Sequence, residues 1–458
     1  MKNSCITFII AGICSILLTI LVIPTFIYAV PQEKLEITAG NVFPGEVAMK
    51  AFTITKDSSV KLDGALGLFL DKGTELVFYG WILDSNTRKV AWQMLNENKE
   101  FERGVNEINK TITLPKGDYE LYYAAALNHS ENVGESRNLV SRIINSIFDL
   151  DKKKYTQTFH DQLKLSVSGV SGDFAEANPL ELVNRQGKNA IISIVRSPND
   201  SRVQKAFALT EETKVLIYAL GEGGSHTAYD YAWIDDIGNY KRIWTMNERA
   251  IKPAGGAKKN MLVNEVITLP AGKYLVYYAT DGSHSYAGWN SRPPDDPQFW
   301  GITIRPLNEN ELANATLIQD FQFPKPVLEL TKIKNNEKVS MRISLDNPMA
   351  LRILCVGEGN RNGKMFDYGW IVRLDTNEKV WEMNGRENCY AGGGEKNRMI
   401  DELIRLDKGN YIVNYVTDDS HSYNDWNDTA PFEPGRWGIT LWVTDEKDRE
   451  NIRTKIEL

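Results

Sequence analysis

A ten-residue phrase occurs twice in this chain and shows that part of it is duplicated. It reads DGSHSYAGWN from Asp281 and DDSHSYNDWN from Asp418, with seven of ten positions identical. The match continues into WGIT from Trp300 and WGIT from Trp437, so the copies stay 137 residues apart. A repeat at a fixed spacing means that one folding unit recurs along the chain. Because the phrase is polar and aromatic, it also predicts a functional loop.

A third, fainter copy of the unit lies on the N-terminal side. In all three copies a run of alternating apolar residues, a polar turn and a second apolar run predict an antiparallel hairpin. A turn with a glycine, which supplies backbone freedom, then leads into a further strand. The hairpins read KAFTITKDSSVKL from Lys50, KAFALTEETKVLI from Lys205 and MRISLDNPMALRI from Met341, and the turns read LPKGDY from Leu114, LPAGKY from Leu269 and LDKGNY from Leu406.

Each unit has short strands with frequent turn signals, which predicts an all-β protein of three tandem antiparallel β-sandwich domains. One amphipathic helix is expected at 135–148, where the first unit should carry the loop phrase. The predicted divisions are an N-terminal segment at 1–30, sandwiches at 31–163, 164–310 and 311–446, and a charged tail at 447–458.

The N-terminal segment predicts export. A basic Lys2 precedes an apolar run from Ile6 to Val30, with Ala29 at a plausible cleavage point. The segment is therefore a signal peptide or an uncleaved anchor, since its length also reaches what a bilayer requires. Either way, we expect the remainder to be secreted or anchored facing outside the cytoplasm, with membrane contact only through an uncleaved N-terminus.

The net charge and the number of cysteines limit which partners and which covalent bonds are expected. The net charge of −7 and pI near 5.5 make nucleic acid an unsuitable partner. Beyond the N-terminal segment only Cys355 and Cys389 remain, and they are expected either to form one bridge or to stay two separate thiols. A chain of this length buries its own cores without a disulfide framework.

The first unit acts as an internal control because it keeps the strands and lacks a set of polar residues. Phe78 and Ala126 stand where the other units have aspartates, and Glu97 stands where they have an arginine. Residues that are lost together while a fold is kept are expected to act together. The candidate ligand-binding residues are Asp230, Arg249, Asp281, Tyr286, Trp289 and Asn290 in the second unit, and Asp367, Arg386, Asp418, Tyr423, Trp426 and Asn427 in the third.

Four interpretations of this set remain open. The residues either tie loops together as a purely structural element, or bind a carbohydrate or a protein partner, since Trp, Tyr and Arg dominate recognition surfaces. Among metals the carboxylates favour Ca²⁺, with Asp281, Asp295, Asp296, Asp418, Asp419, Asp425, Asp428 and Glu433 as candidate ligands. A hydrolase would use His284 with Asp281, and His421 with Asp418, as acid–base pairs.

We favour non-enzymatic binding at the cell envelope through equivalent sites on the second and third units, and expect no resident cofactor other than Ca²⁺. The F-x-L/I-x-x-x-x-x-V opening and the LPAGKY turn-strand resemble those of secreted bacterial β-sandwich repeat modules of the pre-peptidase C-terminal type. This resemblance covers only those short pieces and transfers no site residue. It implies an accessory, non-catalytic extracellular module.

Overall fold

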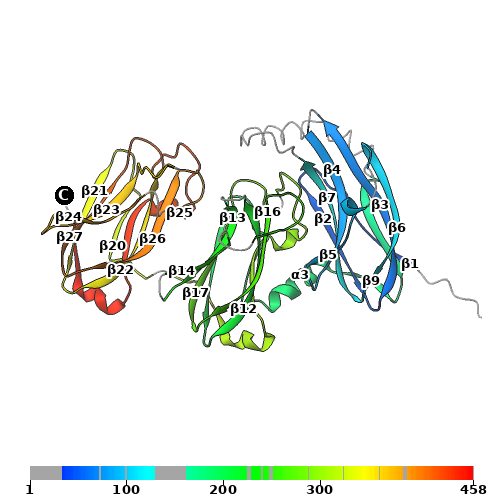
Figure 1. The fold of residues 1–458 in the computed structure, drawn as a ribbon, viewed down its shortest axis with the longest axis horizontal. Coiled ribbons are helices and arrows are strands. Elements are labelled where there is room, and N and C mark those ends of the chain that lie inside the picture. The colour runs from blue at the N-terminus through cyan, green and yellow to red at the C-terminus, as the bar shows by residue number, and fades with distance from the viewer. Residues whose placement is uncertain are drawn as a thin grey trace, which may run out of the picture.

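The protein is built from three antiparallel β-sandwiches arranged in a row (Figure 1). The computed structural model describes residues 34–456 except 72–73, 98–100, 129–160, 224–227, 239–240, 247–250, 287, 323, 361 and 385–388. The N-terminal segment at 1–30 and the expected helix at 135–148 lie outside the described residues. The all-β fold with three tandem sandwiches is as the repeats predict.

The same two layers of strands recur in each sandwich, so we call them sheet A and sheet B. In the first two sandwiches a strand of sheet A also pairs with a strand of sheet B, which joins the two layers, whereas in the third they are separate. Sheet A of the first sandwich has the order β1 (Lys34–Gly40), β8 (Lys164–Val170), β3 (Ser58–Asp71), β6 (Gly104–Leu114). Sheet B has the order β9 (Phe174–Ala177), β2 (Val47–Ile54), β7 (Gly117–Asn128), β4 (Thr74–Asp84), β5 (Lys89–Gln93). Both orders return in the other two sandwiches.

In the second sandwich, sheet A comprises β10 (Ile192–Val195), β18 (Gly301–Pro306), β12 (Thr213–Gly223), β16 (Asn260–Leu269) and β15 (Lys252–Pro253). Its sheet B comprises β19 (Ala315–Ile318), β11 (Arg202–Leu209), β17 (Gly272–Ala279), β13 (Ala228–Asp236) and β14 (Lys241–Thr245). The third sandwich has β20 (Leu328–Thr331), β28 (Gly438–Val443), β22 (Met349–Glu358), β26 (Asn397–Leu406) and β25 (Cys389–Tyr390) in sheet A. Its sheet B has β29 (Ile452–Ile456), β21 (Lys338–Leu345), β27 (Gly409–Val416), β23 (Tyr368–Arg373) and β24 (Glu378–Glu382).

Short helices connect these strands. The α-helix α3 (Pro179–Lys188), which the sequence analysis did not predict, joins the first two sandwiches and is capped by the side chain of Asn178. The 3₁₀ helices are η1 (Met94–Asn96), η3 (Pro297–Phe299), η4 (Glu309–Asn314), η5 (Pro434–Arg436) and η6 (Glu446–Asn451).

Each sandwich has its own hydrophobic core between its two sheets. The repeated glycine turn is fixed in the same way three times. The hydroxyls of Tyr119, Tyr274 and Tyr411 donate to the backbone oxygen four residues earlier, at 2.8, 2.7 and 2.8 Å. A tyrosine that closes a corner of a β-sandwich in this way ties the turn to the core. The G-x-Y pattern in the sequence therefore encodes one local structure.

The strand pairing moves two predicted domain boundaries. β8 pairs with β1 and β3, and β9 pairs with β2, so the first sandwich continues past residue 163 to Ala177. The predicted tail at 447–458 is part of the third sandwich, because β29 pairs with β21. A short strand has little periodicity of its own, and its assignment depends on a partner far away in the sequence.

Of the two states left open for Cys355 and Cys389, the strand order excludes the bridge. Cys355 in β22 pairs with Ile400, and Cys389 in β25 pairs with Met399, so β26 lies between the two cysteine strands. Two strand spacings amount to ~9–10 Å, whereas a disulfide needs Cα atoms within ~7 Å. Cys355 is a buried free thiol.

Candidate functional site

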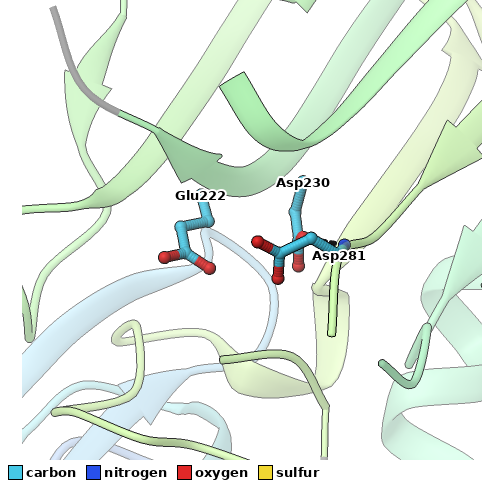
Figure 2. Close-up of side chains that lie close together, drawn as sticks. All are labelled: Glu222, Asp230 and Asp281. Carbon is cyan, nitrogen blue, oxygen red and sulfur yellow. Dashed lines mark hydrogen bonds between the residues drawn. The ribbon is translucent and has the colours of Figure 1, made fainter. Parts of the chain in front are cut away.

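Three carboxylates meet at one end of the second sandwich (Figure 2). Glu222 lies near the end of β12, Asp230 lies in β13, and Asp281 follows β17. One carboxylate oxygen from each lies within 4.8 Å of the others. We call this set the carboxylate triad of the second sandwich.

The third sandwich repeats the arrangement. Glu358 ends β22, Asp367 directly precedes β23, and Asp418 follows β27. Their carboxylate oxygens also lie within 4.8 Å of one another. The structure therefore brings together the two aspartates that the sequence analysis selected in each unit, and adds a glutamate that it missed.

The central aspartate of each triad is buried and fully bonded. Asp230 Oδ1 accepts from the backbone N–H of Asp281 at 2.8 Å, and its Oδ2 accepts from Trp300 Nε1 at 2.9 Å. Asp367 has the same two bonds, from Asp418 N at 2.8 Å and from Trp437 Nε1 at 3.0 Å. These bonds hold the carboxylate at the junction of two strands and the loop.

Burial and like charge disfavour the ionised form of these aspartates. Burial raises the pKa of Asp367 to about 7 against its hydrogen bonds, and the nearby Asp418 and Glu358 carboxylates also raise it. Burial likewise raises the pKa of Asp230, with Glu222 contributing in the same direction. A carboxylate in such a position is protonated or has a cation beside it.

A lysine supplies part of the missing positive charge. Lys396 Nζ lies 3.0 Å from Glu358 Oε1, and Lys259 Nζ lies 2.8 Å from Glu222 Oε1. Lys259 also donates to Asn290 Oδ1 at 2.7 Å, which links the triad to the repeated loop phrase. One ammonium beside three ionised carboxylates leaves a local charge of about −2.

One oxygen of the third triad has no hydrogen-bond partner in the described structure. Glu358 Oε2 is buried, and the side chain of Glu358 is 8% exposed. Burial raises the pKa of this glutamate as well. A buried carboxylate oxygen without a donor is costly unless a proton or a metal ion satisfies it.

The first sandwich has no carboxylate at the three equivalent positions. Gly67 pairs with Phe78 across β3 and β4, as Glu222 pairs with Asp230 across β12 and β13. Ala126 follows Tyr123 by three residues, as Asp281 follows Tyr278. All three carboxylates are thus replaced by residues without a charge, while the strands that would carry them remain.

The aromatic residues of the loop phrase form part of the core. Trp289 is 3% exposed and packs edge-on against His284 and Trp300, with ring centroids 5.2 and 5.0 Å apart. Trp426 is half-buried in the equivalent cluster. Trp289 therefore has no open face on which a sugar ring could stack.

The histidines of the phrase are buried and bonded. His284 and His421 are fully buried, and Nε2 of each lies 2.6 Å from Oδ1 of Asn260 or Asn397. Burial, with the nearby Lys396 ammonium, lowers the pKa of His421 to about 4. Both residues adopt positive φ, at 56 and 55°. They fix the loop from within the core.

The remaining candidate residues divide between loop and core. Tyr286 is half-buried, with its hydroxyl 3.4 Å from Gln298 Oε1, and Asn290 is buried beside Lys259. Tyr423 is half-buried and Asn427 is exposed. Arg249 and Arg386 lie outside the described residues.

The other acidic residues that the sequence analysis considered for Ca²⁺ lie outside the triads. Asp296 is buried against the first sandwich and forms an ion pair with Arg88. Asp425 accepts from Asn335 Nδ2 at 2.7 Å, and Glu433 forms an ion pair with Arg202. The two glutamates of the triads could have been found from the sequence, because a Gly-Glu pair precedes the aspartate hairpin in the second and third repeats only.

Comparison with known proteins assigns no family. No family model and no curated protein matches the chain. Among solved structures, the CUB1-EGF-CUB2 domain of human MASP-1/3 is 11% identical, with 54% of this chain and 95% of that chain covered and a TM-score of 0.17. At that TM-score the two chains do not superpose as whole molecules.

No helix among the described residues is long and apolar enough to span a bilayer.

Proposed function

We propose that this protein is an exported, non-enzymatic binding protein whose second and third sandwiches each hold a divalent cation, Ca²⁺, at the carboxylate triad. The loops around the two triads then recognise a protein or carbohydrate partner outside the cytoplasm. The observation that carries the proposal is the pair of equivalent triads, present in two sandwiches and replaced in the first.

The donor set favours Ca²⁺ over other metals. The triad offers only carboxylate oxygens, and hard cations take oxygen ligands. Neither ring nitrogen of His284 or His421 belongs to the triad, and Nε2 of each is occupied by an asparagine. Zn²⁺ sites usually draw on histidine or cysteine. The remaining Ca²⁺ ligands would be backbone carbonyls and water.

The geometry gives little support to the alternative, hydrolysis by an Asp–His pair. A general base has to reach the proton that it abstracts. His284 and His421 are fully buried. Their neutral, inward-facing rings suit a packing role.

The first test is calorimetric titration of the chelator-stripped protein with CaCl₂. We expect two binding events, of which Asp230→Asn removes one and Asp367→Asn the other. Asp428→Asn is the matched control, because Asp428 is an exposed acid on the same loop outside the triad. The proposal fails if no binding is seen up to about 10 mM, beyond the weakest extracellular Ca²⁺ modules. It also fails if Asp428→Asn abolishes a site that Asp367→Asn leaves intact.

The partner is tested by retention on immobilised glycans and on envelope proteins, with CaCl₂ or with EDTA. Two sites on one chain raise avidity for a repetitive ligand. We therefore expect retention to fall sharply when either triad is disabled, and to fall further when both are. Retention that EDTA leaves unchanged would contradict a role for the cation in recognition.

A further inference from the structure

Neighbouring sandwiches dock in the same way twice. In each case the loop that follows the repeated phrase in one sandwich contacts sheet B of the sandwich before it. Trp81 Nε1 in β4 donates to the backbone oxygen of Asp295 at 2.8 Å. The equivalent residue of the third sandwich, Phe432, packs against the core of the second. The docked loop is flanked by prolines in both cases, as PPDDP and PFEP.

The docked loop is acidic, and at each junction one of its acids pairs with an arginine of the preceding sandwich. Asp296 directly precedes η3 and forms an ion pair with Arg88 of the first sandwich. Glu433 occupies the same place before η5, and its carboxylate lies 2.6 Å from Arg202 Nη1 of the second sandwich. The two arginines differ in position, since Arg88 lies in the turn after β4 and Arg202 begins β11, but each pairs with the acid that precedes the 3₁₀ helix of the docked loop.

The receiving face centres on a Tyr-x-Trp pair on the fourth strand position of sheet B. Tyr79 and Trp81 are each 1% exposed under the loop of the second sandwich. Tyr231 and Trp233, at the same positions, are 8% and 4% exposed beneath the third sandwich.

The third sandwich carries the same face at the outer end of the row, in β21, β23 and β27 (Figure 1). Tyr368 and Trp370 on β23 are its Tyr-x-Trp pair, and both remain partly exposed. Lys338 is the equivalent of Arg202, because each is the first residue of its strand and is paired in the same way. Arg202 pairs with Ala279, which also pairs with Tyr231. Lys338 pairs with Val416, which also pairs with Tyr368. Lys338 Nζ lies 5.7 Å from the Trp370 ring, as the Arg202 guanidinium lies 5.6 Å from the Trp233 ring.

Among the described residues, none from another sandwich forms a hydrogen bond or an ion pair with the side chains of Lys338, Tyr368 or Trp370. We propose that the Lys338–Tyr368–Trp370 face docks a partner protein through an acidic, proline-flanked loop, in the manner of the two internal junctions. This inference does not depend on the cation sites, which lie in other residues. It identifies the partner by the loop chemistry that the chain itself uses twice.

The test uses the full chain and a fluorescein-labelled cyclic peptide of residues 429–436, TAPFEPGR, as the probe. We expect saturable fluorescence anisotropy that weakens by about tenfold or more in Trp370→Ala, as expected for an aromatic anchor. Lys338→Glu should weaken binding similarly, and the peptide with Glu433→Gln should bind less tightly. Lys408→Glu, an exposed lysine at the opposite end of β27, is the matched control and should bind as the unaltered chain does.

Three outcomes would overturn the proposal. The first is no saturable binding up to about 1 mM peptide, which would make the binding free energy weaker than about −4 kcal/mol. The second is binding that both Trp370→Ala and Lys338→Glu leave unchanged while their melting temperatures match the unaltered chain. The third is a concentration-dependent dimer in sedimentation that Lys338→Glu abolishes, which would assign the face to a second copy instead.

Discussion

Asp367 shows how one residue serves both the fold and the site. Its Oδ2 accepts from Trp437 Nε1, a fully buried indole of the core, while its Oδ1 fixes the start of the loop at Asp418. The same carboxylate then faces Glu358 at short range. A residue in this position is costly when charged, because burial and like charges act in the same direction.

This cost predicts a pH dependence of stability in the cation-free protein. The folded state raises the pKa of Asp367 to about 7, far above its ordinary value of 3.8. Because the folded state binds this proton more tightly, the stabilisation is complete below about pH 4 and is lost as pH rises through 7, by up to ~1.4 kcal/mol per pH unit. Chemical denaturation of the unaltered chain and of Asp367→Asn at pH 4 to 8 measures the difference.

Excess CaCl₂ provides the control for that prediction. A bound cation favours the ionised carboxylate, so the stability difference between pH 4 and pH 7 should shrink when Ca²⁺ is present. A slope that is identical in Asp367→Asn and in the unaltered chain would contradict the assignment to this residue.

At the scale of elements, the repeated AGG turn positions the loop that follows the phrase. Gly393 has φ of 71°, and a Cβ placed on it would lie 1.9 Å from the backbone oxygen of Ala430. Gly256 has the same role in the second sandwich, where a Cβ would lie 1.8 Å from the backbone oxygen of Pro293. This AGG turn is absent from the first unit, and in the other two its glycines allow the close backbone approach.

Two alanine substitutions of glycine should therefore have opposite effects. Gly393→Ala forces the loop away and adds strain at positive φ, so we expect a loss of ~1–3 kcal/mol. Gly187→Ala lies within α3, where a Cβ meets nothing closer than 4.0 Å, so a gain of ~0.5–1 kcal/mol is expected. Urea unfolding midpoints measure both, and a gain for Gly393→Ala would refute the close approach.

At the scale of the whole molecule, buried charges fix how the first two sandwiches meet. The side chain of Arg88 is 6% exposed and forms ion pairs with Glu120 of its own sandwich and Asp296 of the next. Tyr218 donates its hydroxyl to Asp296 Oδ2 at 2.9 Å. Each buried carboxylate therefore has donors, as a buried ion network requires.

Removing the Arg88 guanidinium should destabilise this junction strongly. Arg88→Met keeps most of the stem but leaves two buried carboxylates without their partner, which costs about 3–5 kcal/mol. Arg185→Met is the matched control. The ion pair between Arg185 and Asp118 connects α3 to the first sandwich, but the Arg185 side chain is 59% exposed. An exposed pair contributes only ~0–1 kcal/mol. Equal losses in thermal unfolding would contradict the importance of the buried network.

Much of the fold follows from patterns within single segments. Alternation over 205–217 predicts a hairpin because one face of each strand is buried, and the glycine before Tyr274 predicts its turn. The strands β8, β9 and β29 could not be predicted in the same way. Each is short, and its place depends on a partner more than a hundred residues away.

Three repeats of one β-sandwich, and the loss of the Asp230 and Asp281 equivalents from the first, can be predicted from the sequence, because strand alternation and repeat spacing are local properties. The roles of the selected residues depend on the folded structure. It placed Trp289 and His284 in the core, joined Glu222 to the two aspartates, and left the Trp370 face partly open while covering its two equivalents. These are relations between strands distant in sequence, and they are set by packing that no single segment contains.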